Sequence, residues 1–444
     1  MRFFFSSLVI VGATLLSPIE TIHAQAPSIE ISLEESLVDQ EIIIKLNSLQ
    51  PHEKIRIQAL ATDDNGLQWS SFGLFQADDL GEIDLSTQSP IQGSYQKMDS
   101  TGLLWSMQTT EPGASFKIKK DRFLVTITAF RGEQEIASRE LTRFLKAPNV
   151  QKILVQENGL NGILFLPPSK KPLPIVITLT GSSGGFGENR AQALASHGFA
   201  VLALAYFGVE GLPPNLQNIP LEYFETAFTW IKNQPAIDGS RVGIYGISRG
   251  AELALILGSW FPESVQAIVA VVPSSVVHGG LSTTPVPAWL YHNQQVLPSA
   301  TKPSMNLSGN EGKDPEHLAN ASLLFLEGMK DQKSFQAASI PVENITASLL
   351  LISGGDDQLW PSTLYATQIQ RRLEEKKSPI SCQHVNYPKA GHTINLPNLP
   401  QPGPAYYHPI GKIWLSMGGT PEEDQHAAQD SWKKLITFFH ASLK

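Results

Sequence analysis

The chain has 444 residues, which suits two ordinary domains better than one. Hydrophobic residues make up 42% of it and charged residues 17%, which is typical of a globular protein and excludes a disordered or coiled-coil chain. The formal net charge is −8 and the sequence contains no basic block, so we expect no nucleic-acid partner.

The first residues have the pattern of a secretory signal peptide. A positively charged start precedes the apolar run 3–17, and Ala24 provides a small residue for cleavage. An uncleaved membrane anchor is the alternative, but the run is short for a span of about 20 residues. We therefore predict that residues 1–24 are a signal peptide and that the protein is exported, to the periplasm or the medium. No later segment has 18 uninterrupted apolar residues, so we expect no membrane span in the mature chain.

The next part of the chain, residues 25–147, has the pattern of an all-β domain. Its apolar segments are short, rich in β-branched and aromatic residues, and largely alternate with polar ones. Turn residues such as Asp64, Asn65 and Gly66 separate them. This spacing predicts an immunoglobulin-like β-sandwich. The expected strands include residues 29–33, 41–46, 54–60, 67–75, 123–130 and 134–144.

The pattern changes at Pro148, and residues 148–444 are typical of an α/β domain. Continuous apolar runs, which suit strands buried on both faces, alternate with helix-length stretches. We therefore predict a doubly wound parallel sheet, interrupted at about 274–345 by a cap or lid insertion. The expected strands are residues 174–179, 200–205, 242–245, 267–272 and 348–352, and the helices include 189–197, 221–233 and 250–260.

One segment carries the strongest indication of chemistry. Gly246-x-Ser248-x-Gly250 stands directly after an apolar strand and directly before a helix. Glycines on either side of a serine permit the sharp turn that presents a nucleophilic hydroxyl above a sheet. We predict that Ser248 is the nucleophile; the alternative is a glycine-rich loop with an incidental serine.

The loop after the strand 174–179 is the candidate oxyanion-binding element. Residues 180–185 are rich in glycine and serine and can direct main-chain N–H groups at a developing negative charge. We predict that the oxyanion hole is formed by the main-chain N–H groups of Ser182 and Arg249. A phosphate-binding loop is the alternative, but the segment has no lysine and no Gly-x-Gly-x-x-Gly pattern.

The acid and the base follow Ser248 in the order of an α/β-hydrolase, each after a strand. His392 is the predicted base. Asp356 and Asp357 are both candidates for the carboxylate that orients it, and triad logic alone does not separate them. Cys382 is the only cysteine, which excludes an intramolecular disulfide and a cysteine-based metal site, and we expect no metal or cofactor.

Together these residues resemble the family of acyl-CoA thioesterases and bile acid-CoA:amino acid N-acyltransferases. The resemblance implies a β-sandwich followed by an α/β-hydrolase domain, with Ser248, Asp357 and His392 at the triad positions. It covers nearly the whole mature chain and rests on residues 102–105, 197–207, 221–225, 246–253, 355–360, 387–392 and 426–433.

The nucleophile separates two activities within that family. A cysteine forms a thioester that an amine can attack readily, whereas a serine forms a less reactive oxygen ester whose usual fate is hydrolysis. Because position 248 is a serine, the resemblance implies hydrolysis of a small acyl thioester. Export would remove the protein from most coenzyme A, so an exported carboxylesterase or amidase is the second hypothesis. An acyltransferase-like or non-catalytic relative is the third.

Overall fold

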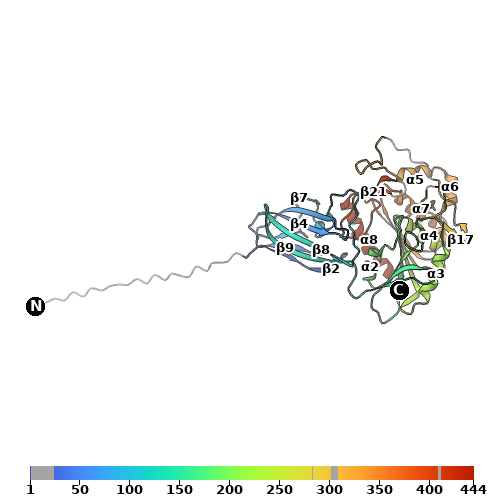
Figure 1. The fold of residues 1–444 in the computed structure, drawn as a ribbon, viewed down its shortest axis with the longest axis horizontal. Helices are drawn as coiled ribbons and strands as arrows, with labels where there is room; N and C mark the ends of the chain where they lie inside the picture. Colours follow the sequence, from blue (N-terminus) through green and yellow to red (C-terminus); the bar gives the residue numbers. More distant parts are fainter. Residues whose placement is uncertain (2–24, 283, 302–308, 409–411) are drawn as a thin grey trace.

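The computed structural model describes residues 1, 25–282, 284–301, 309–408 and 412–444. The predicted signal peptide falls almost entirely in residues 2–24, outside the described residues. A β-domain and a larger α/β-domain lie side by side (Figure 1). Among the described helices, none combines the length and the apolar character needed to cross a membrane.

The N-terminal domain is built from two sheets that share a buried core. In β4 (Lys54–Thr62), alternate side chains from Ile55 onward are buried, as expected for a strand with one face on a core. The predicted strand at 41–46 is shorter in the structure and begins only at Ile44. One sheet has the order β2-β9-β8-β4-β5-β7 and the other β1-β3-β6. The remaining bounds are β1 (Ser28–Ile31), β2 (Glu35–Leu37), β3 (Ile44–Asn47), β5 (Gln68–Gln76), β6 (Ile83–Asp84), β7 (Gln92–Gly93), β8 (Arg122–Arg131) and β9 (Gln134–Phe144), with the short helix α1 (Gly102–Trp105) between β7 and β8.

The C-terminal domain contains an eight-stranded sheet in the order β10-β11-β13-β12-β15-β16-β19-β20. The first two pairings are antiparallel, and all the others are parallel. The expected parallel strands are therefore present, while the strands that extend the sheet at its antiparallel edge were not predicted. The bounds are β10 (Gln151–Val155), β11 (Asn161–Leu166), β12 (Leu173–Leu179), β13 (Ala200–Ala205), β15 (Ile237–Ile247), β16 (Ala267–Val271), β19 (Ser348–Gly354) and β20 (Cys382–Tyr387).

Helices cover both faces of this sheet. In β12, Ile175, Ile177 and Leu179 belong to one buried cluster, while Val176 belongs to another on the opposite face. The period of two in a strand explains this division, because successive side chains point to opposite faces. The first cluster contains residues of α3 (Glu222–Lys232), α4 (Arg249–Trp260) and α7 (Ser362–Glu375), and the second contains residues of α2 (Glu188–Ala195) and α8 (Pro421–Ser442).

Two additions to the sheet lie near its carboxyl edge. The chain leaves the sheet after β16 and returns at β19. The cap or lid insertion predicted at about 274–345 falls within this excursion and stays a prediction. A hairpin of β21 (Ala405–His408) and β22 (Ile413–Ser416) was not predicted. The smaller elements of the domain are β14 (Ile219–Pro220), η1 (Pro262–Ser264), β17 (Trp289–Tyr291), β18 (Gln294–Gln295), α5 (Ser322–Gly328), α6 (Gln332–Ala338) and η2 (Val342–Asn344).

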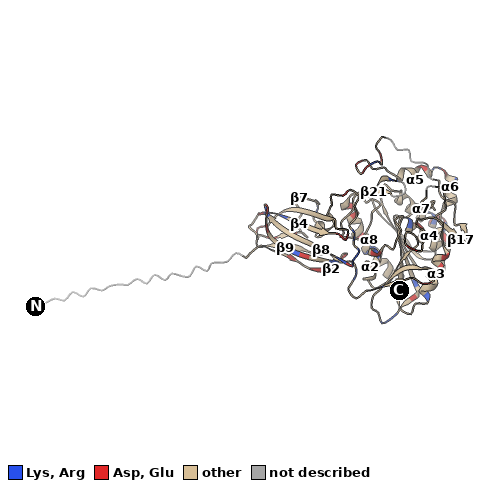
Figure 2. Ribbon diagram, viewed as in Figure 1, with Lys and Arg blue, Asp and Glu red and all other residues tan. Residues whose placement is uncertain are grey.

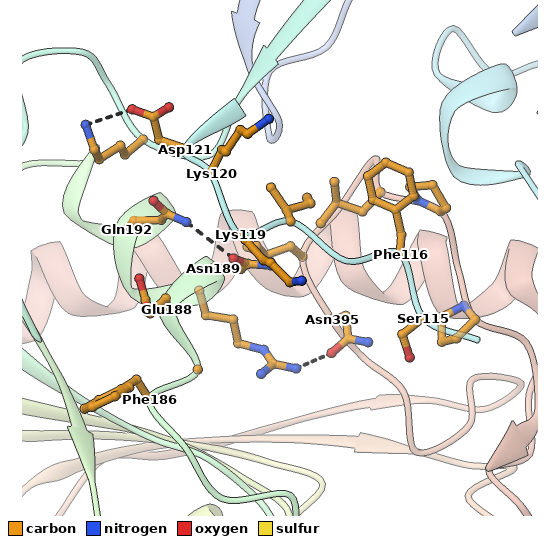
Figure 3. A pocket seen from close by; sticks show the side chains of 18 of the residues that line it. Ser115, Phe116, Lys119, Lys120, Asp121, Phe186, Glu188, Asn189, Gln192 and Asn395 are labelled. Atoms are coloured by element: carbon orange, nitrogen blue, oxygen red, sulfur yellow. Dashed lines mark hydrogen bonds and ion pairs between the residues drawn. The ribbon is translucent and has the colours of Figure 1, made fainter. Parts of the chain in front are cut away.

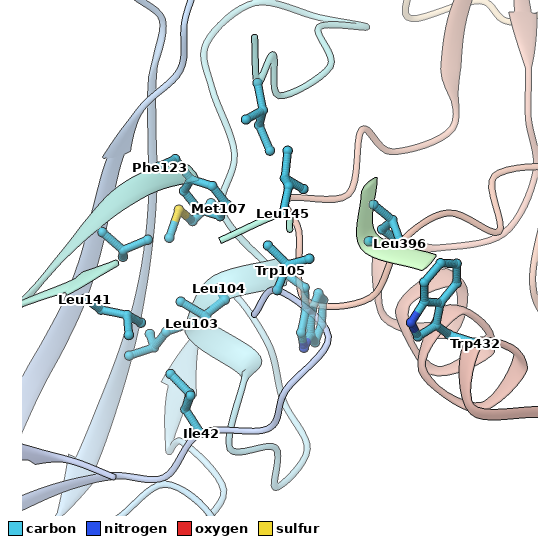
Figure 4. Close-up of a cluster of buried hydrophobic side chains, with 14 of the residues drawn as sticks. Ile42, Leu103, Leu104, Trp105, Met107, Phe123, Leu141, Leu145, Leu396 and Trp432 are labelled. Atoms are coloured by element: carbon cyan, nitrogen blue, oxygen red, sulfur yellow. The ribbon is translucent and has the colours of Figure 1, made fainter. Parts of the chain in front are cut away.

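The two domains share one continuous hydrophobic cluster. Trp105 of α1 lies between the sandwich core and the side chains of Leu396 and Trp432 from the C-terminal domain (Figure 4). All three side chains are nearly inaccessible to solvent. The sandwich is therefore packed against the α8 side of the C-terminal domain rather than joined to it only by a linker.

A polar contact reinforces this junction. Asp39 of the sandwich accepts a hydrogen bond from the Trp432 indole at 2.8 Å, and its carboxylate lies 2.5 Å from Nε2 of His197. Burial alone would raise the pKa of Asp39, but hydrogen bonding and the charge of His197, together with the Trp432 bond, hold that pKa below its usual value. Elsewhere, basic and acidic residues are interspersed over both domains (Figure 2).

Candidate active site

Ser248 lies on a sharp turn between β15 and α4. Its backbone has φ 56° and ψ −122°, a strained conformation for a residue with a side chain. A Cβ on Gly246 would lie 2.2 Å from the carbonyl oxygen of Gly250, and one on Gly250 would lie 2.4 Å from that of Leu179. Both glycines of the motif are therefore required by the close approach of the backbone.

His392 lies between Ser248 and Asp357. Its Nε2 is 3.0 Å from Oγ of Ser248, and its Nδ1 is 2.9 Å from Oδ2 of Asp357. The other carboxylate oxygen, Oδ1, accepts the N–H groups of Leu359 and Trp360 at 3.0 and 3.1 Å. The structure thus brings the three predicted residues into one hydrogen-bonded chain, in a region where each is at least nine-tenths buried.

Asp356 is directed away from this chain. Its Oδ2 accepts the N–H of Gly419 at 2.9 Å, and its Oδ1 accepts the side-chain amide of Gln358 at 3.1 Å. Of the two neighbouring carboxylates that the sequence left as candidates, only Asp357 contacts His392, and Asp356 fixes the loop around Gly419.

The predicted oxyanion-hole residues lie beside Ser248. Ser182 and Arg249 line the same cavity as the Ser248 hydroxyl. Because Arg249 is the first residue of α4, its N–H has no partner within the helix. A Cβ at Gly181 would be 3.1 Å from that of Ser248, so the loop that carries Ser182 passes directly against the nucleophile. Within the described residues, the main-chain N–H groups of Ser182 and Arg249 donate to no other protein group.

The Arg249 side chain forms hydrogen bonds and an ion pair next to Ser248. It donates to the carbonyl oxygens of His278 and Gly279 at 2.9 and 3.0 Å and lies 3.2 Å from Glu252. Glu252 is fully buried and also accepts the Trp289 indole N–H at 2.7 Å. Burial raises the pKa of Glu252, while the charge of Arg249 opposes that rise. This network anchors the start of the excursion at the site.

A cavity of about 810 Å³ opens at Ser248. The excursion, the Leu359–Trp360 segment and the β21–β22 hairpin enclose it, and most of its side chains are apolar. His278 of the excursion and His408 of β21 also line it. Tyr406 of the hairpin was not predicted at the site, and burial raises its pKa against a hydrogen bond with Ser182. The apolar lining includes Leu281, Pro285, Val286, Pro287, Phe325, Leu359, Trp360 and Leu415.

No group of three or more His, Cys, Asp or Glu side chains in the described ranges is arranged to hold a metal ion. Cys382 is free and half-buried on the edge strand β20, and burial raises the pKa of its thiol to about 12. Its position on the far edge strand separates it from Ser248, which lies after β15. The side chains that are arranged to react at this site are therefore a hydroxyl, an imidazole and a carboxylate.

The sheet order and the placement of a serine after β15, an aspartate after β19 and a histidine after β20 define an α/β-hydrolase. Residues 219–444 match the family model described as "BAAT / Acyl-CoA thioester hydrolase C terminal", and residues 39–157 match "Acyl-CoA thioester hydrolase/BAAT N-terminal region". The chain belongs to this family, as its sequence resemblance predicted. The family and the fold both support thioester hydrolysis as the reaction class.

Two similar proteins align with nearly the whole chain. Acyl-coenzyme A thioesterase 5 of Mus musculus is 34% identical over 428 residues, which are 93% of this chain and 96% of that protein. Acyl-coenzyme A thioesterase 2, mitochondrial, of Homo sapiens is 32% identical over 420 residues, or 91% and 82% of the two chains. Among solved structures, Pyrococcus horikoshii acylaminoacyl peptidase has a TM-score of 0.44 and 14% identity, covering 91% of this chain and 60% of that one.

Proposed function

We propose that this protein is a serine-dependent acyl-CoA thioesterase. The observation that carries the proposal is the chain of hydrogen bonds from Asp357 through His392 to Ser248 at the mouth of the 810 Å³ cavity. The family supports an acyl thioester as the substrate, and the apolar lining suits an acyl chain.

Ser248 attacks the thioester carbonyl in the first half of the reaction. His392 accepts the hydroxyl proton at Nε2, and Asp357 holds Nδ1–H and stabilises the imidazolium that forms. The N–H groups of Ser182 and Arg249 stabilise the oxyanion of the tetrahedral intermediate. Collapse of that intermediate expels the thiol, which takes the proton from His392, and leaves an acyl ester on Ser248.

Water completes the reaction in the second half. His392 removes a proton from a water molecule, the hydroxide attacks the acyl ester, and Ser248 recovers its proton as the acid leaves. Hydrolysis is favoured over transfer to an amine because an oxygen ester is less reactive toward amines than the thioester that a cysteine would form.

A substrate panel tests the proposal on the purified protein. We expect turnover of an acyl-CoA chain-length series, with lower kcat/KM for p-nitrophenyl esters of the same acids. Turnover of the oxygen esters alone would refute the thioesterase and favour the carboxylesterase hypothesis. Covalent labelling by a fluorophosphonate should be stoichiometric in the native protein and absent in Ser248→Ala; a folded protein that takes no label would favour a non-catalytic relative.

Export is a separate proposal that rests on the sequence of residues 1–24 alone. N-terminal sequencing of the protein from its source cells should give Gln25 as the first residue, in the periplasmic or extracellular fraction. An intact N-terminus in the cytoplasmic fraction would refute export and leave the proposed chemistry unaffected.

A further inference from the structure

A second cavity, of about 680 Å³, lies between the two domains. The sandwich contributes residues 115–116 and 118–121 and Lys146 to it, while the catalytic domain contributes Lys152, the start of α2 and residues 395–396 and 399–402. Figure 3 shows Lys119 pointing into the space that Asn189 and Asn395 also line. Both domains are therefore needed to form this interdomain cleft.

The interdomain cleft is cationic, although the whole chain is acidic. Its lining contains two carboxylates, each already engaged: Asp121 pairs with Lys146 at 3.4 Å, and Glu188 pairs with Lys152. Lys119 forms no ion pair with any described residue. The five cationic side chains of the lining are Lys119, Lys120, Lys146, Lys152 and Arg190.

Arg190 connects the interdomain cleft to the nucleophile. It lines both the cleft and a smaller cavity of about 300 Å³ that also contains Ser248 and His392. Its side chain donates to Asn395, and its Nε is buried without a partner among the described residues. The smaller cavity in turn shares Ser182, Ser248, Leu359 and Tyr406 with the apolar 810 Å³ cavity. The three cavities thus adjoin one another through shared lining residues, with Ser248 between a cationic end and an apolar end.

We propose that the interdomain cleft binds the phosphate groups of the substrate's leaving group, with Lys119 and Arg190 as the contacting cations. The inference rests on the proposed thioesterase function, and it sets the direction of the substrate. The acyl chain enters the apolar cavity, and the thiol with its phosphorylated nucleotide lies toward the sandwich. Lysine and arginine are the side chains that bind phosphate, and a cation without a carboxylate partner is available to do so.

Two thioesters of the same acid test this proposal, one of coenzyme A and one of N-acetylcysteamine, which carries no phosphate. In Lys119→Glu we expect the KM for the acyl-CoA to rise about tenfold at low salt, and in Lys119→Gln about threefold, with kcat unchanged. Kinetics with the N-acetylcysteamine thioester should not change. Raising the ionic strength should reduce the difference, because exposed charges are screened.

Lys117→Glu is the matched control, since Lys117 lies two residues away but outside the interdomain cleft. It should leave the KM for acyl-CoA within about twofold of wild type. An acyl-CoA KM that is equal in wild type and Lys119→Glu at low salt would overturn the proposal while the thioesterase function stands.

Binding of adenosine 3′,5′-bisphosphate, measured by calorimetry, separates the cleft from the chemistry. We expect binding to wild type and Lys117→Glu and about tenfold weaker binding to Lys119→Glu. If no thioester is hydrolysed, the proposed thioesterase function is refuted, and this measurement still tests whether the interdomain cleft binds phosphate groups. Equal affinity for wild type and Lys119→Glu, or no binding to wild type, would overturn it.

Discussion

The two faces of the catalytic sheet are covered differently. On one face, α3, α4 and α7 close a core that lies wholly within the hydrolase domain. On the other face, α2 and α8 cover the sheet and their buried side chains continue into the core of the sandwich. Ser248, the proposed nucleophile, lies at the start of α4, whereas α8 contacts both the loop that carries His392 and the sandwich.

The two faces therefore have different roles: one carries the Ser248 turn and the other packs against the sandwich. The face covered by α3, α4 and α7, here called the closed face, carries the Ser248 turn, whose close backbone contacts require glycine at positions 246 and 250. The face covered by α2 and α8, here called the open face, packs against the sandwich, and the interdomain cleft lies between the two domains. Replacement of the reactive side chains at and around the Ser248 turn should therefore remove the chemistry and keep the fold, while removal of buried side chains on the open face should lower stability.

Replacement of the nucleophile should have the largest effect. We expect Ser248→Ala to reduce kcat by roughly 10⁴-fold or more, since the hydroxyl forms the acyl-enzyme. The far-UV circular dichroism and the thermal midpoint should remain close to wild type. Activity within tenfold of wild type would contradict the assignment of the nucleophile.

The two neighbouring aspartates provide the next test. Asp357→Asn should lower kcat by roughly 10³–10⁴-fold, because the amide cannot stabilise the imidazolium of His392. Asp356→Asn is the matched control and should retain kcat within about tenfold, since Asp356 contacts Gly419 and Gln358 and not the histidine. Equal losses in the two variants would contradict the separation of their roles.

Local patterns made the closed face predictable. Gly246-x-Ser248-x-Gly250 after an apolar run specifies a strand, a sharp turn and a helix within a few residues, and all three are present. His392 could be placed beside a serine 144 positions away because the carboxyl ends of parallel strands meet at one edge of the sheet. Family resemblance, and not local pattern, distinguished Asp357 from Asp356.

The open face left little local signal. Lys119 and Arg190 belong to different domains and line one cavity because the domains pack together, with Trp105 against Leu396 and Trp432. No spacing in the sequence predicts such a meeting. The β21–β22 hairpin was missed because its strands have four residues each and are mostly half-buried, so they lack a clear alternating pattern.

Substitution of Trp432 tests whether packing on the open face stabilises the protein. Trp432→Ala should lower the free energy of unfolding by about 3 kcal/mol, since it removes a buried aromatic side chain and the hydrogen bond to Asp39. Lys433→Ala, on the exposed side of the same helix, should change it by less than about 1 kcal/mol. Urea unfolding followed by circular dichroism measures both. A loss of under about 1 kcal/mol in Trp432→Ala would show that the domains pack independently.

Asp424 of α8 tests how the open face is coupled to the site. It is buried and accepts the N–H of Gly391, the residue before His392. Burial raises its pKa to about 7, and the charges of Asp357, Asp356 and Glu423 also raise it, while the Gly391 bond opposes them. Folded protein therefore holds this proton more tightly than the unfolded chain, whose aspartates titrate near pH ~4. The contribution of Asp424 to stability is largest below pH ~4 and falls as the pH rises to about 7.

An uncharged side chain should remove this pH dependence. Relative to wild type, Asp424→Asn should gain on the order of 2 kcal/mol in the free energy of unfolding at pH 8 and almost nothing near pH ~4. Asp430→Asn, on the same helix, should behave oppositely. Burial would raise the pKa of Asp430, but hydrogen bonds from Lys434 and Tyr387 and the charge of Lys434 hold it below its usual value. Urea titrations from pH 4 to 8 decide the matter: parallel stability curves for wild type and Asp424→Asn would mean that folding does not raise the pKa of Asp424.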